Sequence, residues 1–91
     1  MALLADPVPL VRARAAEGLS HFDGNAEMIL TRLQPALHDA DPLVRESAFV
    51  AVSRLAPAGD SMVALKAGLQ DNDPVIRKEA ESALRRISAS R

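Results

Sequence analysis

The stretch Asp39-Ala40-Asp41-Pro42-Leu43-Val44-Arg45 decides the fold, because the chain repeats it. It returns as Asp71-Asn72-Asp73-Pro74-Val75-Ile76-Arg77, and a weaker copy, Asp6-Pro7-Val8-Pro9-Leu10-Val11-Arg12, stands near the start. The closing arginines lie at positions 12, 45 and 77, so the copies are separated by 33 and then 32 residues. A constant period in this range is typical of stacked helical arrays. The sequence therefore predicts an array of short helical units.

The composition limits both the core and the function. The 91 residues are 48% hydrophobic but only 2% aromatic, so the core must be built from Leu, Val, Ile and Ala. The net charge is −1 and the pI is about 6.1, whereas a nucleic-acid-binding domain usually carries a concentrated basic patch and a high pI. The chain has no cysteine, which excludes disulfides, thiolate nucleophiles and cysteine-based metal sites. We expect no nucleic-acid partner.

The chain also has no stretch that would place it in a membrane. No apolar run approaches the roughly 20 residues that a membrane span requires. The opening residues 1–6 are too short for a signal peptide. We therefore expect a soluble, cytoplasmic protein without a membrane partner.

Apolar spacing and breaking residues divide the chain into helices. After one possible turn over residues 1–5, we expect a helix over 10–21, with Leu10 and Val11 on its inward face, ended by Gly24. Asn25 caps the next helix, which Pro35 either bends or splits. A third helix begins at position 42 and ends before the loop 56–60. Asp60 or Ser61 caps a fourth, and a fifth begins at position 74 and frays over 88–91. No segment alternates as a strand would.

The copies superpose over whole helices. The inward positions of the second helix of each unit correspond across the three copies. These positions are Val11, Val44 and Ile76; Ala15, Ala48 and Ala80; Leu19, Val52 and Leu84; and Phe22, Leu55 and Ile87. Each unit is a helical hairpin that cannot bury its own apolar stripe, so neighbouring units must stack. We predict a single domain over 1–91, divided into a partial first repeat (1–23), a second (24–57) and a third (58–91).

Through this repeated motif the chain resembles the HEAT repeat family, and most closely the short variant found in phycobilisome-lyase-like proteins. The residues that carry the resemblance are Asp39, Asp41, Pro42, Val44, Arg45 and Ala48, and then Asp71, Asp73, Pro74, Ile76, Arg77 and Ala80. The first copy departs from the pattern, with Val8 in place of the capping aspartate. The resemblance implies an all-α, right-handed α-α superhelix of about two and a half to three hairpins.

The aspartates and arginines of the turns suggest a ladder between units. Arg45 falls about one turn into its helix, from where it can reach Asp39 or Asp71. A partly buried bidentate pair of this kind would fix the stacking register; the alternative is that the arginines are merely solvated. The predicted ladder comprises Asp6, Arg12, Asp39, Asp41, Arg45, Asp71, Asp73 and Arg77.

The two ends of the array differ. The position of Ala16 and Phe49 becomes Glu81 in the last unit, close to Glu79, Arg85 and Arg86, which predicts a polar closing face. The first unit lacks a full first helix, so Leu3, Leu4, Leu10 and Val11 are poorly covered. We expect either part of a longer solenoid or a homo-oligomer formed through this N-terminal edge.

The sequence offers little for catalysis, and we expect no enzyme activity, metal or cofactor. His21 and His38 lie near predicted helix C-termini, where a cation is favoured by the helix dipole. Neither is followed by Glu, so the His-Glu pairs by which HEAT-type deoxyhypusine hydroxylases hold iron are absent. No Gly-rich phosphate loop or calcium loop is present.

Binding of a protein or peptide is the better interpretation. In this architecture the second helices line a concave surface. With Val44, Ala48 and Leu55 facing inward, Glu46, Val50 and Ser53 face outward, and Ala13 and Ser20 fall at equivalent positions. The predicted partner-binding residues are Glu17, His21, Glu46, Phe49, Val50, Ser53, Arg54, Lys78, Ser82, Arg85 and Arg86.

The sequence leaves two alternatives open. Phe49 either faces the partner or packs between stacked helices. The chain is predicted to be a non-catalytic interaction scaffold; the alternative is an accessory subunit or domain of an enzyme, such as a bilin lyase-like protein that handles a chromophore.

Overall fold

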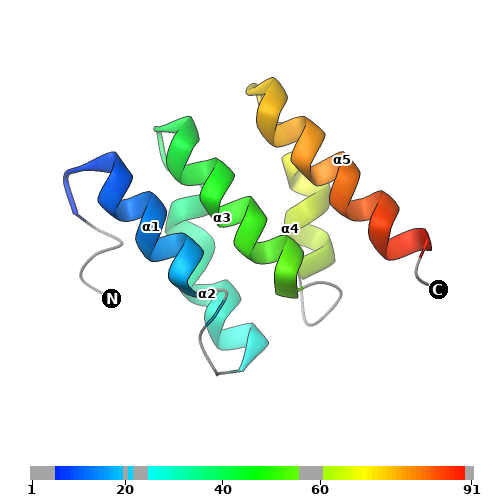
Figure 1. The fold of residues 1–91 in the computed structure, drawn as a ribbon, viewed down its shortest axis with the longest axis horizontal. Helices are drawn as coiled ribbons and strands as arrows, with labels where there is room; N and C mark the ends of the chain where they lie inside the picture. Colours follow the sequence, from blue (N-terminus) through cyan, green and yellow to red (C-terminus); the bar gives the residue numbers. More distant parts are fainter. Residues whose placement is uncertain (1–5, 20, 22–24, 56–60, 90–91) are drawn as a thin grey trace.

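The computed structural model describes residues 6–19, 21, 25–55 and 61–89. Five α-helices fill most of these ranges, and no strand occurs in them (Figure 1). The helices are α1 (Pro9–Leu19), α2 (Ala26–Leu37), α3 (Pro42–Leu55), α4 (Ser61–Gly68) and α5 (Pro74–Ala89). The predicted all-α helical repeat fold is confirmed.

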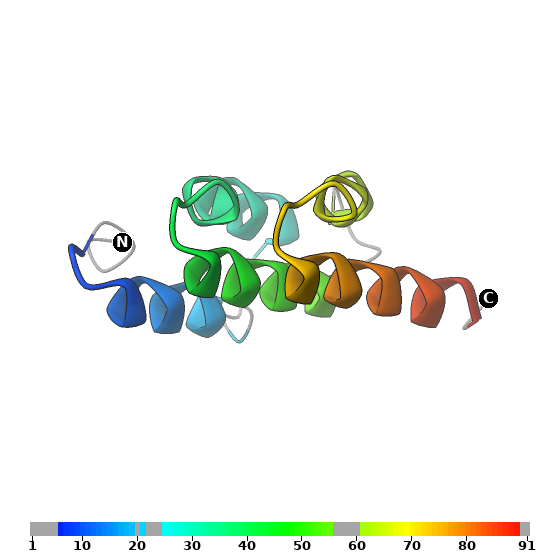
Figure 2. The same ribbon diagram turned by 90° about the horizontal axis from the view of Figure 1, so that it is seen from above.

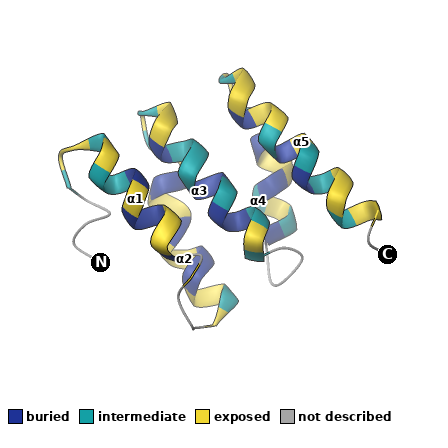
Figure 3. Cartoon of the chain, in the orientation of Figure 1, coloured by how far each residue is buried: buried dark blue, intermediate teal, exposed yellow. Residues whose placement is uncertain are grey.

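The helices form two layers (Figure 2). The second helices of the units, α1, α3 and α5, run side by side in one layer, and α2 and α4 lie in the other. The central helix, α3, contacts each of the other four helices. Its residues Val44, Ala48, Ala51 and Val52 are fully buried, and the dark face of α3 in Figure 3 shows this centre of the core.

Small side chains let the layers approach closely. Ala15, Ala48 and Ala80 hold the same repeat position, and all three are buried as predicted. Gly68 provides a further close approach, because a Cβ atom there would lie 2.8 Å from Phe49 Cε1 and 3.0 Å from the Cβ of Ala80. A glycine at the end of α4 therefore makes room for the largest side chain of α3.

Two predictions for α1 are wrong. Leu10 was expected to face inward, but it is 49% exposed, while Ala13, expected on the outward face, is buried. The physical reason is the close approach of α3, whose contact with α1 is the most extensive between helices. Ala13 and Ala16 have side chains small enough to allow this approach, so the buried stripe of α1 is rotated toward α3.

The helix ends follow the predicted chemistry in most places. Asn25 Oδ1 accepts hydrogen bonds from the backbone N–H groups of Glu27 and Met28 at 2.8 and 3.3 Å, so the predicted cap is confirmed. Pro35 does not split its helix, which continues to Leu37. Because Pro35 lies in the last turn, its missing N–H costs only one bond near the helix end. Gly24, Asp60, Ser20, Phe22 and the turn over 1–5 lie outside the described residues, as do the repeat boundaries at 23/24 and 57/58.

Candidate partner-binding surface

The Asp-Pro turns start the second helices. The side chain of Asp41 accepts a hydrogen bond from the N–H of Leu43 at 2.9 Å, and Asp73 does the same for Val75 at 2.8 Å. The following prolines occupy the first helical position, where a missing N–H does no harm. In the first copy Val8 supplies only its carbonyl to the start of α1. Both predicted aspartate caps are confirmed.

Two rungs of the ladder join the three units. Arg12 donates from Nε and Nη2 to the carboxylate of Asp39, at 2.9 and 3.1 Å. Arg45 donates from the same atoms to Asp71, at 3.0 and 3.2 Å. The Asp71 and Arg45 side chains are only 11% and 14% exposed. Four of the eight predicted ladder residues thus form partly buried bidentate pairs, whereas Arg77 is exposed and, among the described residues, neither it nor Asp6 has such a partner.

The arginine of a rung also binds backbone carbonyls in the turn that precedes its own helix. The Nη1 atom of Arg45 donates to the carbonyls of Asp39 and Ala40, at 2.8 and 3.1 Å. The carboxylate of Asp71 in turn accepts the N–H of Asp73 at 2.8 Å. One arginine therefore links the turn of its own unit to the turn of the next, which fixes the register between α3 and α5.

The two ion pairs shift the pKa values of residues that form them. The hydrogen bond between Arg12 and Asp39 is the main cause that lowers the pKa of Asp39 and raises the pKa of Arg12. For Asp71, burial works to raise the pKa, but hydrogen bonds from Arg45 and from the N–H of Asp73 outweigh it, so the pKa is lowered. Both carboxylates are therefore held in the charged form that the ladder needs.

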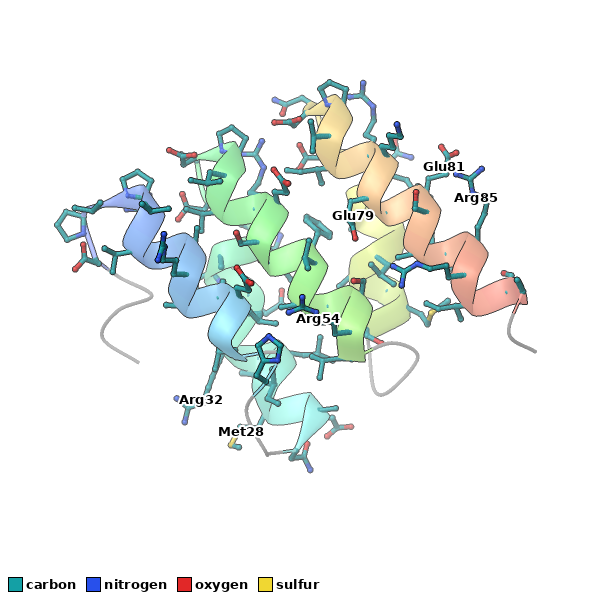
Figure 4. All side chains as sticks on the ribbon, in the orientation of Figure 1. Met28, Arg32, Arg54, Glu79, Glu81 and Arg85 are labelled. Atoms are coloured by element: carbon teal, nitrogen blue, oxygen red, sulfur yellow. The ribbon has the colours of Figure 1, made fainter. Side chains whose placement is uncertain are left out.

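The outward face of the α1–α3–α5 layer carries most of the predicted binding residues. Glu46, Val50 and Ser53 of α3 are half-buried, and Arg54 is exposed. On α5, Lys78, Arg85 and Arg86 are exposed and Ser82 is half-buried. Glu17 and His21 are exposed at the end of α1. Arg54 Nη1 lies 3.0 Å from His21 Nε2, which ties α3 to the end of α1 across this face (Figure 4).

Phe49 does not belong to this face. It is 4% exposed, and its ring packs against Gly68. The prediction that it contacts a partner is corrected in favour of the packing alternative, because its position on α3 turns the side chain toward α4 and α5.

A row of exposed aliphatic side chains was not predicted. Leu10, Leu43 and Val75 occupy the second position of α1, α3 and α5, and they are 49%, 44% and 53% exposed. They are equivalent in the repeat, so they form one row across three adjacent helices. The signal was present in the sequence, since the residue after the proline that begins each of these helices is apolar in every copy.

A groove of about 510 Å³ starts from this row. It is lined by Leu10, Ala13, Arg14, Glu17, Gly18, His21, Leu43 and Ser47. Two of the predicted binding residues, Glu17 and His21, thus share a groove with two members of the aliphatic row.

The opposite layer holds a second groove, which sequence reasoning missed. Its volume is about 600 Å³, and it lies between α2 and α4 with Phe49 at its base. The lining residues are Gln34, Leu37, His38, Phe49, Val63, Ala64, Ala67, Gln70 and Asp71. Because the groove depends on how far apart α2 and α4 lie in space, and α3 separates these helices in the sequence, no local pattern indicates it.

The comparisons with known proteins agree with this geometry. A family model described as HEAT repeats matches residues 1–85. The chain belongs to the HEAT repeat family. HEAT repeats commonly serve as protein-interaction scaffolds and are generally non-catalytic. Neither the curated proteins nor the solved structures gave a significant match. The family match does not separate the phycobilisome-lyase-like variant from other HEAT repeats.

Two further findings concern this HEAT-repeat chain. Among the described residues, no group of three or more His, Cys, Asp or Glu side chains could hold a metal ion. None of the helices in the described ranges has both the length and the apolar character needed to cross a bilayer.

Proposed function

We propose that this chain is a non-catalytic interaction module that binds a protein or peptide on the outward face of the α1–α3–α5 layer. The observation that carries the proposal is the aliphatic row Leu10, Leu43 and Val75, which is repeated in register on three neighbouring helices. Single exposed aliphatic residues are normal on protein surfaces, but a contiguous row rimmed by polar groups marks an interaction site.

The surroundings of the row define the partner. Arg14, Glu17 and His21 line the groove at one end of the row, and Arg54 lies beside His21. A partner with an apolar anchor for Leu10 and Leu43 and with charged residues on both sides of it would match this surface. Such an anchor would supply most of the affinity, and the charges would supply specificity.

The test compares two matched substitutions. Leu43→Asp and Val63→Asp each replace an exposed aliphatic residue in the first turn of a helix, where an acidic side chain is favoured by the helix dipole. They lie in opposite layers, since Val63 is at the second groove. Both variants should therefore fold, and circular dichroism melting checks this.

The readout is the set of proteins retained from the source cell by the immobilised chain. We expect Val63→Asp to retain the partners of the unmodified chain, and Leu43→Asp to lose them. A second variant, Val50→Asp with Arg54→Glu, should lose them too. Retention by Leu43→Asp, with loss by Val63→Asp, would move the site to the other layer and overturn the proposal.

A second candidate is an accessory subunit that handles a chromophore. The groove between α2 and α4 favours it, because its volume of about 600 Å³ and its largely apolar lining suit a small molecule. Co-expression with a bilin source would then give visible absorbance on the purified chain, and this absorbance should disappear in Val63→Asp. Absence of colour removes this candidate.

A further inference from the structure

Each end of the ladder carries half of a ladder contact. At one end, Arg77 Nη1 donates to the carbonyl of Asp71 at 2.8 Å, as Arg45 Nη1 does to the carbonyl of Asp39 at 2.8 Å. In Arg45, the other side of the guanidinium, Nε and Nη2, binds a carboxylate. The same two nitrogens of Arg77 have no acceptor among the described residues. Arg77 is thus held in the orientation of a rung, and no carboxylate of the described residues binds its Nε and Nη2 atoms.

The other end carries the complementary half. Asp6 Oδ1 accepts the N–H of Val8 at 2.9 Å, as Asp71 Oδ1 accepts the N–H of Asp73 at 2.8 Å. Asp71 additionally binds Arg45 through both oxygens. Within the described ranges, no arginine side chain reaches the carboxylate of Asp6. Asp6 therefore has the same turn geometry as Asp71, without a guanidinium partner among the described residues.

We infer that Arg77 of one copy of this chain pairs with Asp6 of a second copy, so that copies stack head to tail. The contact repeats the geometry that already joins Arg45 to Asp71, and it places α1 of the second copy beside α5 of the first. Both groups are oriented before association, so little side-chain freedom is lost when the pair forms.

The faces that would meet are complementary beyond this pair. Figure 4 shows Glu81 and Arg85 on the side of α5 that points away from α3, and Glu79 on the side toward α3. Arg14 of α1 holds the same repeat position as Glu79, which lies on the side of α5 toward the preceding helix, α3. In the stack, Arg14 of the second copy would therefore face α5 of the first copy, on the side where Glu81 lies. A hollow of about 670 Å³ on that side is lined by Leu69, Glu81, Leu84, Arg85, Ser88 and Ala89. The Glu81–Arg85 ion pair is exposed and therefore easily exchanged.

Head-to-tail stacking is heterologous, so a pair of copies still has one open end of each kind. The mass of the assembly should therefore rise with concentration beyond that of a dimer. Stacking should also leave the aliphatic row exposed. Leu43 is 44% exposed although α1 packs beside α3, and Leu10 would have the same environment once α5 of another copy packs beside α1. The inference concerns the ends of the array and does not depend on the proposed partner surface.

Two substitutions test the inference by analytical ultracentrifugation. Asp6→Arg and Arg77→Ala should each weaken self-association at least about tenfold, since each loses a charged hydrogen-bonded pair. An equimolar mixture of the two variants should form a dimer and nothing larger. The reason is that Arg77 of the first variant and Asp6 of the second are both intact, while the outer ends, substituted at positions 6 and 77, have no carboxylate to pair with a guanidinium.

The control is Glu46→Arg, which makes the same change of charge as Asp6→Arg in the middle of the array. It should leave self-association unchanged. If Asp6→Arg does not fold, Asp6→Asn keeps the acceptor for the Val8 N–H and should still weaken association about tenfold. A monomeric unmodified chain up to about 1 mM, or a mixture without heterodimer, would overturn the inference.

Discussion

Replacement of Arg45 by alanine gives the most direct measure of what the ladder contributes to stability. The guanidinium makes two bonds to Asp71, one to Asn72 and two to backbone carbonyls, all between 2.8 and 3.2 Å. Hydrogen bonds that involve a charged group contribute about 1.5–3 kcal/mol to stability, and bonds that share one side chain do not add fully. Because the Arg45–Asp71 pair is only 11–14% exposed, solvent screens it weakly.

We therefore expect Arg45→Ala to lower the free energy of unfolding by about 2–3 kcal/mol. For a chain of this size the melting temperature should fall by about 10–20 °C. The control is Arg14→Ala, which removes an exposed arginine of α1 that belongs to neither rung. Its expected effect is within about 0.5 kcal/mol of zero. Both variants are measured by urea unfolding at low protein concentration, so that self-association does not contribute.

A double-mutant cycle with Asp71→Asn isolates the charge pair. Asparagine keeps an oxygen that accepts the N–H of Asp73, so the turn itself is preserved. The two substitutions should show a coupling energy of about 1–2 kcal/mol. Equal melting temperatures for Arg45→Ala and Arg14→Ala, or a coupling energy near zero, would refute the assignment of the stacking register to the ladder.

Two further predictions concern the glycines and the response to acid. Gly68→Ala should destabilise the chain by about 1–3 kcal/mol, because the new methyl group meets Phe49 at 2.8 Å. Gly18→Ala should instead stabilise it by about 0.5 kcal/mol, since nothing lies within 4 Å of its Cβ position; urea unfolding of both separates steric cost from helix propensity. The folded-state pKa values of Asp39 and Asp71 are lowered, so the stability they supply is present above their unfolded pKa of about 3.9 and is lost as the pH falls through the folded values. Unfolding measured from pH 6 to 2.5 should show this loss, and the combined Asp39→Asn and Asp71→Asn variant should show less of it.

The parts of the structure that depend on local chemistry were predictable from the sequence. Asp41 and Pro42 start a helix because their side chains act on backbone groups one or two residues away. The rung from Arg45 to Asp71 was also predictable, although the residues are 26 apart, because the repeat places both at one edge of the array. In a repeat protein every unit contacts its neighbour through equivalent positions, so a contact between residues far apart in the sequence can be predicted from the repeated motif.

The parts that depend on how closely two helices approach were not predictable. Leu10 and Val11 are adjacent apolar residues about 100° apart on a helix, so periodicity alone could not decide which of them faces inward. The contact of Phe49 with Gly68 joins two residues at non-equivalent repeat positions, and no spacing in the sequence relates them. Ala13 is buried only because α3 comes close to α1. These positions are set by packing, which a single sequence does not encode in its pattern.

The cap, the ladder and the proposed binding surface are properties of the same few residues. Asp41 caps α3 through the N–H of Leu43, and Arg45 stands two residues further on. The rung that fixes the register between units therefore also fixes where Leu43 stands relative to Val75 on the next helix. A row of aliphatic side chains on separate helices can receive one partner only if that register is kept. For this reason the Asp-Pro turns govern both the stacking of the helices and the surface that the stack presents.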